Sequence, residues 1–411
     1  MTSRREEGIA LVKILFMMTI LLAVAAYASR ATRVDIRISQ NDYLGKRALQ
    51  IAEAGLGRAW RQIETDLTAG QTLDQEITGG AGFWSTDGAG TGSRSGYRTA
   101  SIGSGSYYVR VENNADDPGP SASTTDNDKL VLIRAIGDIG GSERVIKAVL
   151  EQLPLFGNGL FAKYGVDLRG GGTTDSYDSS LGSYGGSNAN GNQGNVGSNG
   201  DITNNGTPTT VNGTENAGGT ITQGSATITG GMNPGQPLVA LPPVSPCTSF
   251  SNGAGITPAN DYNSNNHTLR GNSSDQIVLQ PGNYCFDSIT LNGNATLTVN
   301  GAVTITVNST TNLTGGGVVN STGDPSNLKI YSSQVGTGNS QGITVNGGAS
   351  AAMLIYAPET NVTFTGGSSI FGAAVGGTIK LAGGTNFHYD AHSASIGGAA
   401  TQLISWHEVR S

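Results

Sequence analysis

The N-terminal part of the chain is apolar all round over one long run and then apolar on one side only. Ile9 to Ala28 carries a single charge, on Lys13. At about 1.5 Å per residue, a helix over this run would span about 30 Å, the thickness of a membrane's hydrocarbon core. Over residues 29–69, apolar residues recur mostly three and four positions apart, which predicts a continuing amphipathic helix. These residues are Val34, Ile38, Leu44, Ala48, Ile51, Ala52, Leu56, Ala59, Trp60, Ile63 and Leu67. We therefore expect one helix with a membrane-spanning half at 9–28 and a half-buried half at 29–69.

A cleaved secretory signal is the alternative for this N-terminus. Small residues at the end of the apolar run, Ala23, Ala25, Ala26 and Ala28, could imitate a signal-peptide cleavage site. A cleaved signal peptide need not continue the helical periodicity of the chain that follows it. Here the apolar residues keep a helical spacing beyond Ala28. We favour the uncut helix, with Arg4 and Arg5 kept in the cytoplasm by the positive-inside rule.

Three runs of alternating apolar and polar residues follow within residues 70–153. They are Tyr107–Glu112, Lys129–Gly137 and Arg144–Leu150, and this alternation predicts half-buried strands. The string Asp138-Ile139-Gly140-Gly141 predicts a tight turn between the last two strands. We expect a small antiparallel sheet on which the helix packs.

An acidic loop lies between the first two of these strands. It contains Asp116, Asp117, Asp126 and Asp128, whose carboxylates could bind Ca²⁺. The spacing fits no EF-hand loop, so we favour a solvated acidic loop and treat the metal site as the weaker alternative.

The rest of the chain has the texture of a repetitive β-structure. Residues 154–246 are rich in Gly, Asn and Ser and end in a Pro-rich linker, and residues 247–411 alternate strongly. Late strand centres fall at Val362, Ile370, Ile379 and Phe387, spaced by 8, 9 and 8 residues. Three such steps would make a coil near 24 residues, within the range of solenoid repeats.

The fold class predicted from these patterns is α+β, mostly β. It combines the long helix, the small antiparallel sheet and a right-handed parallel β-helix with Thr and Asn in outward-facing rows. A jelly-roll or sandwich head stays open as the alternative. Leu403, Ile404 and Trp406 in the tail would cap the open end of the β-helix.

Composition and charge narrow the function classes. Charged residues make up 13% of the chain and the net charge is −7, with no Lys/Arg cluster, so a nucleic-acid partner is not expected. The two cysteines, Cys247 and Cys285, lie in the part expected outside the cytoplasm, where a pair usually forms a disulfide. Two free, buried thiols are the alternative.

Two strings at the N-terminus resemble a known family. Arg5-Glu6-Glu7-Gly8 followed by Ile9-Ala10-Leu11-Val12 resembles a prepilin peptidase site. The stretch Ala48 to Trp60, with Ala52-Glu53-Ala54-Gly55-Leu56 at its centre, resembles the N-terminal domain of PilX-type type IV pilus assembly proteins. The resemblance covers about residues 4–70.

This resemblance implies how the chain is processed and what it meets. Residues 1–8 would be a leader cut between Gly8 and Ile9 by prepilin peptidase, and the new Ile9 amine would be methylated. The helix would stay in the inner membrane with the head outside the cytoplasm until assembly. It would then join other pilins and the pilus assembly machinery at the cell surface.

The fifth mature residue departs from the family pattern. Most major pilins carry Glu there to neutralise a neighbouring subunit's N-terminal amine, whereas this chain has Lys13. A cation would repel that amine in a low-dielectric filament core. We infer a minor or initiating subunit, against the alternative of a lysine that merely reaches the headgroups.

A second resemblance concerns the C-terminal part. Asn283–Phe286, Leu354–Pro358, Phe371-Gly372 and Phe387–Asp390 resemble an uncharacterised domain that often follows PilX-type N-termini. The likeness supports the domain order and implies no activity.

The best candidate for catalysis is His388-Tyr389-Asp390 with His392. A His–Asp pair could act as an acid–base or metal site. No nucleophile motif or third partner accompanies it, so we favour a structural role at a corner of the β-helix. We expect no enzyme activity and no cofactor.

Three functions remain. The favoured one is a minor type IV pilin-like subunit that primes, joins or tips a pilus and presents its head to a glycan or solid surface. The second is an envelope-anchored β-helix polysaccharide hydrolase or lyase. The third is a pseudopilin of type II secretion.

Overall fold

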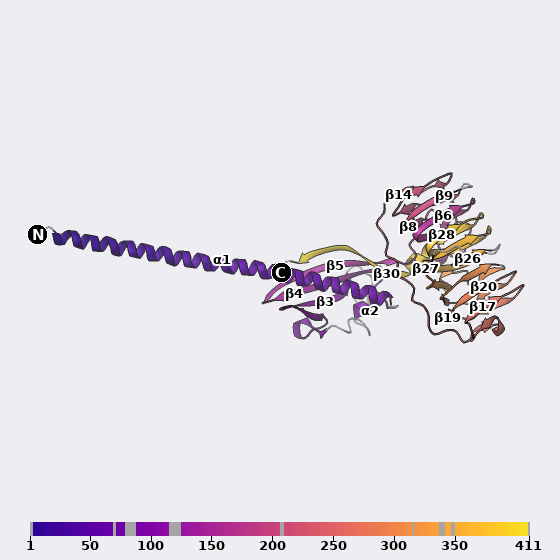
Figure 1. Ribbon diagram of the computed structural model, residues 1–411, viewed down its shortest axis with the longest axis horizontal. Helices are drawn as coiled ribbons and strands as arrows, with labels where there is room; N and C mark the ends of the chain where they lie inside the picture. Colours follow the sequence, from indigo (N-terminus) through magenta and orange to yellow (C-terminus); the bar gives the residue numbers. More distant parts are fainter. Residues whose placement is uncertain are drawn as a thin grey trace. The chain divides into compact units, whose positions relative to one another are not determined.

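The computed structural model describes residues 3–68, 71–78, 88–114, 125–205, 209–314, 316–336, 342–346 and 350–409, and its account of side chains leaves out 3–11, 68, 399 and 400. The chain is mostly β, with one long N-terminal helix and a few short ones, as predicted (Figure 1). It divides into two compact units. The first contains Met1–Glu151 and Thr401–Ser411, and the second contains Gln152–Ala400.

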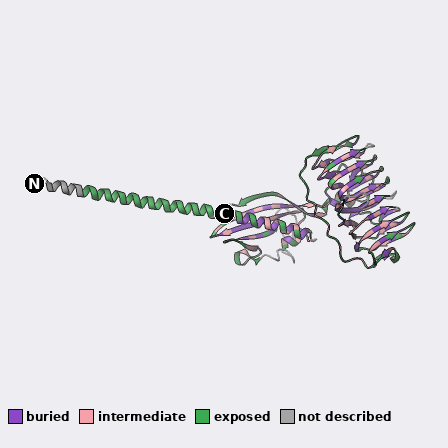
Figure 2. Cartoon of the chain, in the orientation of Figure 1, coloured by how far each residue is buried: buried purple, intermediate pink, exposed green. Residues whose placement is uncertain are grey.

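α1 is one continuous helix, Ser3–Thr68, which confirms the single helix predicted from the sequence. From Val12 onward its apolar first half is exposed, as Figure 2 shows in green; Phe16 is 67% exposed and Leu22 is 72% exposed. The most apolar 18-residue stretch has a mean hydropathy of 2.0, so α1 is long and apolar enough to cross a membrane. A signal sequence would meet the same two criteria. Val34 and Ile38, although part of the predicted stripe, are exposed.

The second half of α1 packs onto a sheet through small and branched side chains. Ala48, Ala52, Ala59 and Ile63, four to seven positions apart on one face, are completely buried. The helix backbone touches the sheet most closely at Gly137, where an added Cβ would lie 2.0 Å from the carbonyl oxygen of Ala48. The predicted half-buried stripe is therefore confirmed from Ala48 onward.

The family-like motif in α1 has a packing explanation. Ala52, Gly55 and Leu56 are buried, whereas Glu53 and Ala54 are exposed. A Cβ on Gly55 would lie 2.9 Å from the Cβ of Tyr107 on the sheet. The inward positions of this motif are thus small or apolar because the sheet lies directly against them.

The sheet of the first unit has six strands in the order β1-β2-β3-β4-β5-β30. Their bounds are β1 Gly88–Ala89, β2 Arg98–Ile102, β3 Gly105–Asn113, β4 Leu130–Ile139, β5 Ser142–Pro154 and β30 Gly397–Val409; the helices are α2 Leu73–Thr78 and the 3-10 turn η1 Gly92–Arg94. β1 to β5 pair antiparallel in sequence order. β3, β4 and β5 match the three predicted strands.

The predicted tight turn joins β4 and β5. Ile139 pairs with Ser142 across a two-residue connection. Gly140 and Gly141 have φ values of 58° and 78°. Positive φ at both central residues is the geometry that hairpin turns of type I′ require, and glycine adopts it without strain.

The C-terminal tail was predicted to cap the β-helix, and this prediction is wrong. β30 is the edge strand of the six-stranded sheet. The Trp60 indole donates to the Thr401 hydroxyl at 2.7 Å, and that hydroxyl donates to Glu64 at 2.9 Å. These bonds fix the tail to α1, while Ile404 and Trp406 remain half exposed.

The second unit consists of short strands and four 3-10 turns. The strands are β6 Leu160–Arg169, β7 Thr173–Tyr177, β8 Val196–Ser198, β9 Asp201–Asn205, β10 Thr210–Val211, β11 Glu215–Ala217, β12 Ile221–Thr222, β13 Thr227–Ile228, β14 Met232–Pro234, β15 Ile256–Thr257, β16 Tyr262–Asn263, β17 Thr268–Gly271, β18 Gln276–Leu279, β19 Gly282–Phe286, β20 Ser288–Leu291, β21 Thr296–Val299, β22 Val303–Val307, β23 Thr311–Thr314, β24 Gly317–Asn320, β25 Leu328–Ser332, β26 Ile343–Asn346, β27 Ala351–Thr365, β28 Ser369–Leu381 and β29 Asn386–Asp390. The turns are η2 Ser179–Leu181, η3 Ala259–Asp261, η4 Pro325–Asn327 and η5 Ala391–Ser395.

Most strand pairs of this unit are parallel and join one repeat to the next. Leu269 lies beside Ile289, for example, and Ile305 beside Ile330. Most inward residues of these rows are apolar and buried and form one continuous core, with buried polar exceptions such as Thr311 and Glu215. Parallel pairing argues against the jelly-roll alternative, whose strands are antiparallel.

The repeat is shorter than the predicted 24 residues where β27 and β28 lie. Val362 pairs with Ile379 and Ile370 pairs with Phe387, so one repeat there is 17 residues. The four predicted strand centres are all buried, but they make two steps per repeat instead of three. The reason is that β27 and β28 each run through two faces with a register shift near Ala357 instead of ending at a turn.

The order of the strands in space differs from their order in the chain. β28 pairs with β27 on one side and with β6 on the other, and β29 likewise pairs with β28 and β7. Strands from residues 160–234 therefore extend the ladder that residues 268–390 build. The predicted boundary at residue 246 does not separate two cores, because Val166 and Ile379 belong to the same one.

A segment without regular structure, residues 235–250, connects these two stretches; we call it the strap. Its Val239 exchanges two hydrogen bonds with the Asn199 side chain, at 2.7 and 2.8 Å. Tyr356 donates to the Pro242 carbonyl at 2.8 Å. The strap is thus fixed to the strands by side chains that bond its backbone.

Candidate binding surface

A long polar groove lies on one outer face of the second unit. Its volume is about 760 Å³. It crosses β23, β26, β27, β28, β6 and β9, and its polar lining consists mainly of Thr and Asn side chains. These are Thr203, Asn205, Thr310, Asn312, Thr344, Asn361, Thr363 and Thr378.

The register of the parallel strands places these side chains in straight rows. One row runs Asn312, Thr344, Thr363, Lys380, Asp167 and Thr203. With about 4.8 Å between neighbouring strands, six residues span about 24 Å. The inward neighbours in the next row, from Ile343 to Ile202, are buried in the core. The predicted outward-facing Thr and Asn rows are present on this face.

Two glycines line the groove, and one of them, Gly165, leaves it hollow. Gly342 and Gly165 line it where the neighbouring strands carry Asn361, Thr378 and Asp201. A Cβ on Gly165 would meet only the Asp201 carbonyl oxygen, at 3.4 Å. The space over Gly165 is therefore empty because glycine has no side chain. The backbone there would accept a larger residue, whose side chain would fill the groove.

Four ionised side chains lie in this mostly neutral surface. Asp167 and Arg169 bind each other through two contacts of 2.7 and 2.6 Å. Asp201 accepts from the backbone N–H and the hydroxyl of Thr220, which lowers its pKa. Lys380 is exposed in the middle of the row.

Hydroxyl and amide side chains in rows suit a ligand that carries many hydroxyl groups. Each Thr donates and accepts one hydrogen bond, and each Asn offers a carbonyl and two N–H donors. Rows about 24 Å long match an extended oligomer better than one small molecule. The groove can therefore hold an extended, hydroxyl-rich polymer such as a glycan chain.

The sequence contains a local signal for this groove. Asn312-Leu313-Thr314, Asn361-Val362-Thr363 and Asp201-Ile202-Thr203 each place polar residues on both sides of a core residue. Such triplets predict one outward face. The alignment of the triplets across six strands depends on the register, which local patterns do not give.

His388 was predicted beside Asp390, but its hydrogen-bonding partner is Asp175. The His388 Nδ1 lies 2.6 Å from the Asp175 Oδ1, and Tyr184 donates to the other Asp175 oxygen at 2.7 Å. The imidazole packs against the rings of Tyr184 and Phe371, whose centroids are 4.1 and 4.7 Å away from it and 5.5 Å from each other. The pKa of the Tyr184 hydroxyl is raised to about 12, first by burial and then by Asp175.

Asp390 is separate from this pair and holds a corner of the chain. It is completely buried and accepts from the Ser179 N–H at 2.9 Å, the Ser179 hydroxyl at 2.8 Å and the His392 N–H at 3.1 Å. Burial raises its pKa. His392 itself is exposed. The three candidate residues thus have different surroundings and do not form one site.

The acidic loop is described only in part. Asp116 and Asp117 lie outside the described residues. Asp126 donates its backbone N–H to Asp74, and burial followed by Asp128 raises the Asp126 pKa to about 6. Over the described ranges, no three His, Cys, Asp or Glu side chains are grouped to hold a metal ion.

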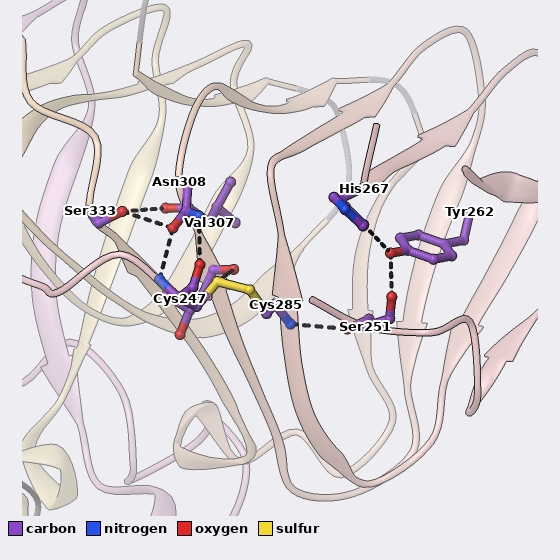
Figure 3. The surroundings of a disulfide bond; sticks show 9 residues. Cys247, Ser251, Tyr262, His267, Cys285, Val307, Asn308 and Ser333 are labelled. Atoms are coloured by element: carbon purple, nitrogen blue, oxygen red, sulfur yellow. Dashed lines mark hydrogen bonds between the residues drawn. A yellow bond between two sulfur atoms is a disulfide. The ribbon is translucent and has the colours of Figure 1, made fainter. Parts of the chain in front are cut away.

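Cys247 and Cys285 form a disulfide (Figure 3). It joins the strap to β19, 38 positions later in the chain. Asn308 accepts from the Cys247 N–H at 3.0 Å and donates to its carbonyl at 2.9 Å. Ser251 bonds the backbone N–H of Cys285 at 3.0 Å. The disulfide predicted from the sequence is therefore confirmed.

Two further acidic residues of the second unit, Glu359 and Asp324, have hydrogen-bond partners. Glu359 accepts from the Lys163 ammonium and from the Tyr164 hydroxyl, and the Lys163 bond is the main reason why its pKa is lowered. Asp324 caps the turn η4 by accepting from the Ser326 N–H. Two carboxylates, those of Asp167 and Asp201, line the groove, and each is bound by another residue.

The N-terminal candidates lie on α1. Gly8 and Ile9 are in the helix backbone, and their side chains lie outside the description. Lys13 is exposed. Cleavage and methylation at Gly8–Ile9 stay predictions.

One family model matches part of the second unit of this chain. Residues 288–396 match the model of a domain of unknown function, DUF7305. A search of curated proteins finds no match.

Two solved structures are similar at low level. The competence-associated pilin ComZ from Thermus thermophilus is 13% identical, with 89% of this chain and 97% of that chain covered and a TM-score of 0.27. An ice-binding protein from the Antarctic ascomycete Antarctomyces psychrotrophicus is 13% identical, with 58% and 98% covered and a TM-score of 0.23. TM-scores this low carry no argument about fold or function.

Proposed function

We propose that this chain is a membrane-anchored, type IV pilin-like subunit whose head binds an extended glycan. The observation that carries the first part is α1. One unbroken helix has a first half with exposed apolar side chains and a second half packed on an antiparallel sheet. Exposing so many apolar side chains to water would be unfavourable, so a bilayer or a bundle of similar helices must cover them.

The sequence strings around Gly8 and Ala52–Leu56 support a pilin-type anchor over another membrane protein. Residues 1–8 are the leader, Ile9 is the first mature residue, and the head lies outside the cytoplasm. Lys13 makes the chain a minor or initiating subunit, because a filament core filled with copies of it would bring unpaired cations together in a medium of low dielectric constant.

We infer that the parallel ladders of the second unit wind as a right-handed β-helix, with the groove on one outer face. This head acts by binding and not by catalysis. The groove supports binding because its rows offer many neutral hydrogen-bonding groups and few ionised ones. The runner-up, a hydrolase or lyase, would need an acid and a base at the groove, and the buried His388–Asp175 pair is not among the residues that line it.

Mass spectrometry of the N-terminus tests the pilin-like anchor. Protein from membranes and from sheared filaments should begin at methylated Ile9, and a start near Ser29 would reject the assignment. Lys13→Glu should increase the share of the protein found in filaments, and Lys13→Gln, which removes the charge without adding a carboxylate, should increase it less. Deleting the gene and scoring pili and secretion separately would distinguish a pilus subunit from a secretion pseudopilin.

A further inference from the structure

Lys380 differs from the other ionised side chains of the groove. Both oxygens of Asp167 are bound by Arg169, and Asp201 accepts two bonds from Thr220. Lys380 is exposed and makes no hydrogen bond or ion pair with the residues that the structure describes. An ammonium group is thus left available at the centre of a binding surface.

The neighbours of Lys380 suit an anion. In the register, Thr363 lies one strand away on β27, and Asp167 lies one strand away on β6. The four charges of the groove sum to zero, but Arg169 binds Asp167 and Thr220 binds Asp201, so the Lys380 ammonium is the charged group there without a bound partner among the described residues. A carboxylate held there would receive a charge-assisted hydrogen bond from Lys380. The Thr363 hydroxyl, one strand away, would be near enough to donate a second bond to it.

We propose that the groove selects polysaccharides whose sugars carry carboxylates, and that Lys380 is the residue that recognises the carboxylate. This inference rests on the proposed glycan-binding function. A neutral glycan would use the Thr and Asn rows and leave the ammonium hydrated. An acidic glycan uses the same rows and also pairs with Lys380, and such charge complementarity contributes mainly to selectivity.

Two polymers with the same backbone test this inference. Polygalacturonate carries a carboxylate on each sugar, and its methyl ester has the same backbone without the charge. Binding of both to the full-length protein in detergent solution, in the presence of a chelator, is measured at low and at physiological salt. The expected preference of the unmodified protein for the acidic polymer is about fivefold, as for one exposed ion pair, and it should fall as salt rises.

Three variants separate the contributions. Lys380→Gln should reduce the preference to about one and keep the binding of the neutral ester. Gly165→Val should weaken both polymers, because it fills the groove on a backbone that accepts a side chain. Lys329→Gln removes a lysine on β25, outside the groove lining, and should change nothing.

The outcomes are distinct. Equal binding of the two polymers, or a preference that survives in Lys380→Gln, overturns the role of Lys380 and leaves glycan binding standing. Binding of neither polymer, or binding that Gly165→Val does not alter, overturns the glycan-binding groove as well.

Discussion

His388 and Asp175 form a buried pair although 213 positions separate them in the chain. They lie side by side because β29 and β7 are parallel neighbours, with His388 directly opposite Asp175. Tyr184, from the loop after η2, completes the group by donating to Asp175. This pair therefore links β7, one of the strands of residues 160–234, to β29. It also holds the loop that carries Tyr184.

Removing Asp175 should destabilise this region. In Asp175→Asn the imidazole and the Tyr184 hydroxyl both lose a charged acceptor in a site where Asp175 is 1% exposed. Breaking such a buried pair costs about 3 kcal/mol. Hydrogen exchange measured by mass spectrometry should show faster exchange in peptides covering 173–195 and 386–395.

His392→Gln is the matched control for this change, because His392 is a neighbouring but exposed histidine. It should change the exchange of these peptides by less than about 0.5 kcal/mol. Unchanged exchange in Asp175→Asn would show that the pair contributes little to the stability of the ladder.

The first unit should lose stability as pH rises. Burial, followed by the nearby Asp66 carboxylate, raises the pKa of Glu76 from 4.5 to about 8. The folded pKa lies above the unfolded one, so the stabilising contribution is complete below about pH 4.5 and is lost as pH rises to about 8. All three tryptophans, Trp60, Trp84 and Trp406, belong to the first unit, so tryptophan fluorescence during urea unfolding reports on this unit alone.

Glu76→Gln should remove most of this pH dependence, since the amide stays neutral over the whole range. Glu53→Gln, at an exposed position of α1, should keep it. The explanation fails if the unfolding midpoint of the unmodified protein does not change between pH 5 and pH 8.5, or if Glu76→Gln changes with pH as the unmodified protein does.

The features predicted correctly from the sequence depend on residues close together in the chain. The features that were missed depend on how distant strands pair. The stripe from Ala48 to Ile63 and the Gly140-Gly141 turn follow from spacings of a few residues, and both are present in the structure. The partner of His388 could not be predicted, because Asp175 lies 213 positions earlier in the chain. The two residues meet only because β7 and β29 pair with each other. The repeat length was overestimated at β27 and β28, because each of these strands runs through two faces with a register shift. Pro358 lies at the shift in β27, but a single proline in an alternating run does not predict that the strand continues past it. The tail was assigned to the wrong unit because alternation marks Leu403–Trp406 as a strand without naming the sheet.

The closest helix–sheet contact should be sensitive to a single methyl group. Gly137→Ala would place a Cβ 2.0 Å from the Ala48 carbonyl oxygen and 2.6 Å from the Ala52 nitrogen. Both are backbone atoms, so the helix must move away. Overpacking of this kind costs about 1–3 kcal/mol, and we expect the upper end.

Gly57→Ala is a suitable control for Gly137→Ala, because nothing lies within 4 Å of the added Cβ in α1. It should stabilise the helix by about 0.5–1 kcal/mol. The two alanines should therefore shift the tryptophan-detected urea midpoint in opposite directions. A neutral effect of Gly137→Ala would mean that α1 packs less closely on β4 than the structure shows.

The strap should become accessible to proteases when its disulfide is removed. Residues 235–250 have no strand pairing, so they are held by Asn199, Tyr356, Asn308 and the Cys247–Cys285 bond. Loss of a disulfide typically costs about 2–5 kcal/mol, largely by freeing the unfolded chain. In the Cys247→Ser, Cys285→Ser double variant, limited proteolysis should therefore cut within 235–250 before any strand of the second unit is cut. Ser251→Ala keeps the disulfide and removes one hydrogen bond to Cys285, so it should resist cleavage as the unmodified protein does. If the double variant is cut first within β27 or β28, the disulfide stabilises the whole ladder and not the strap. Cleavage confined to 235–250 would instead show that the ladder keeps its structure when its covalent connection to the strap is broken.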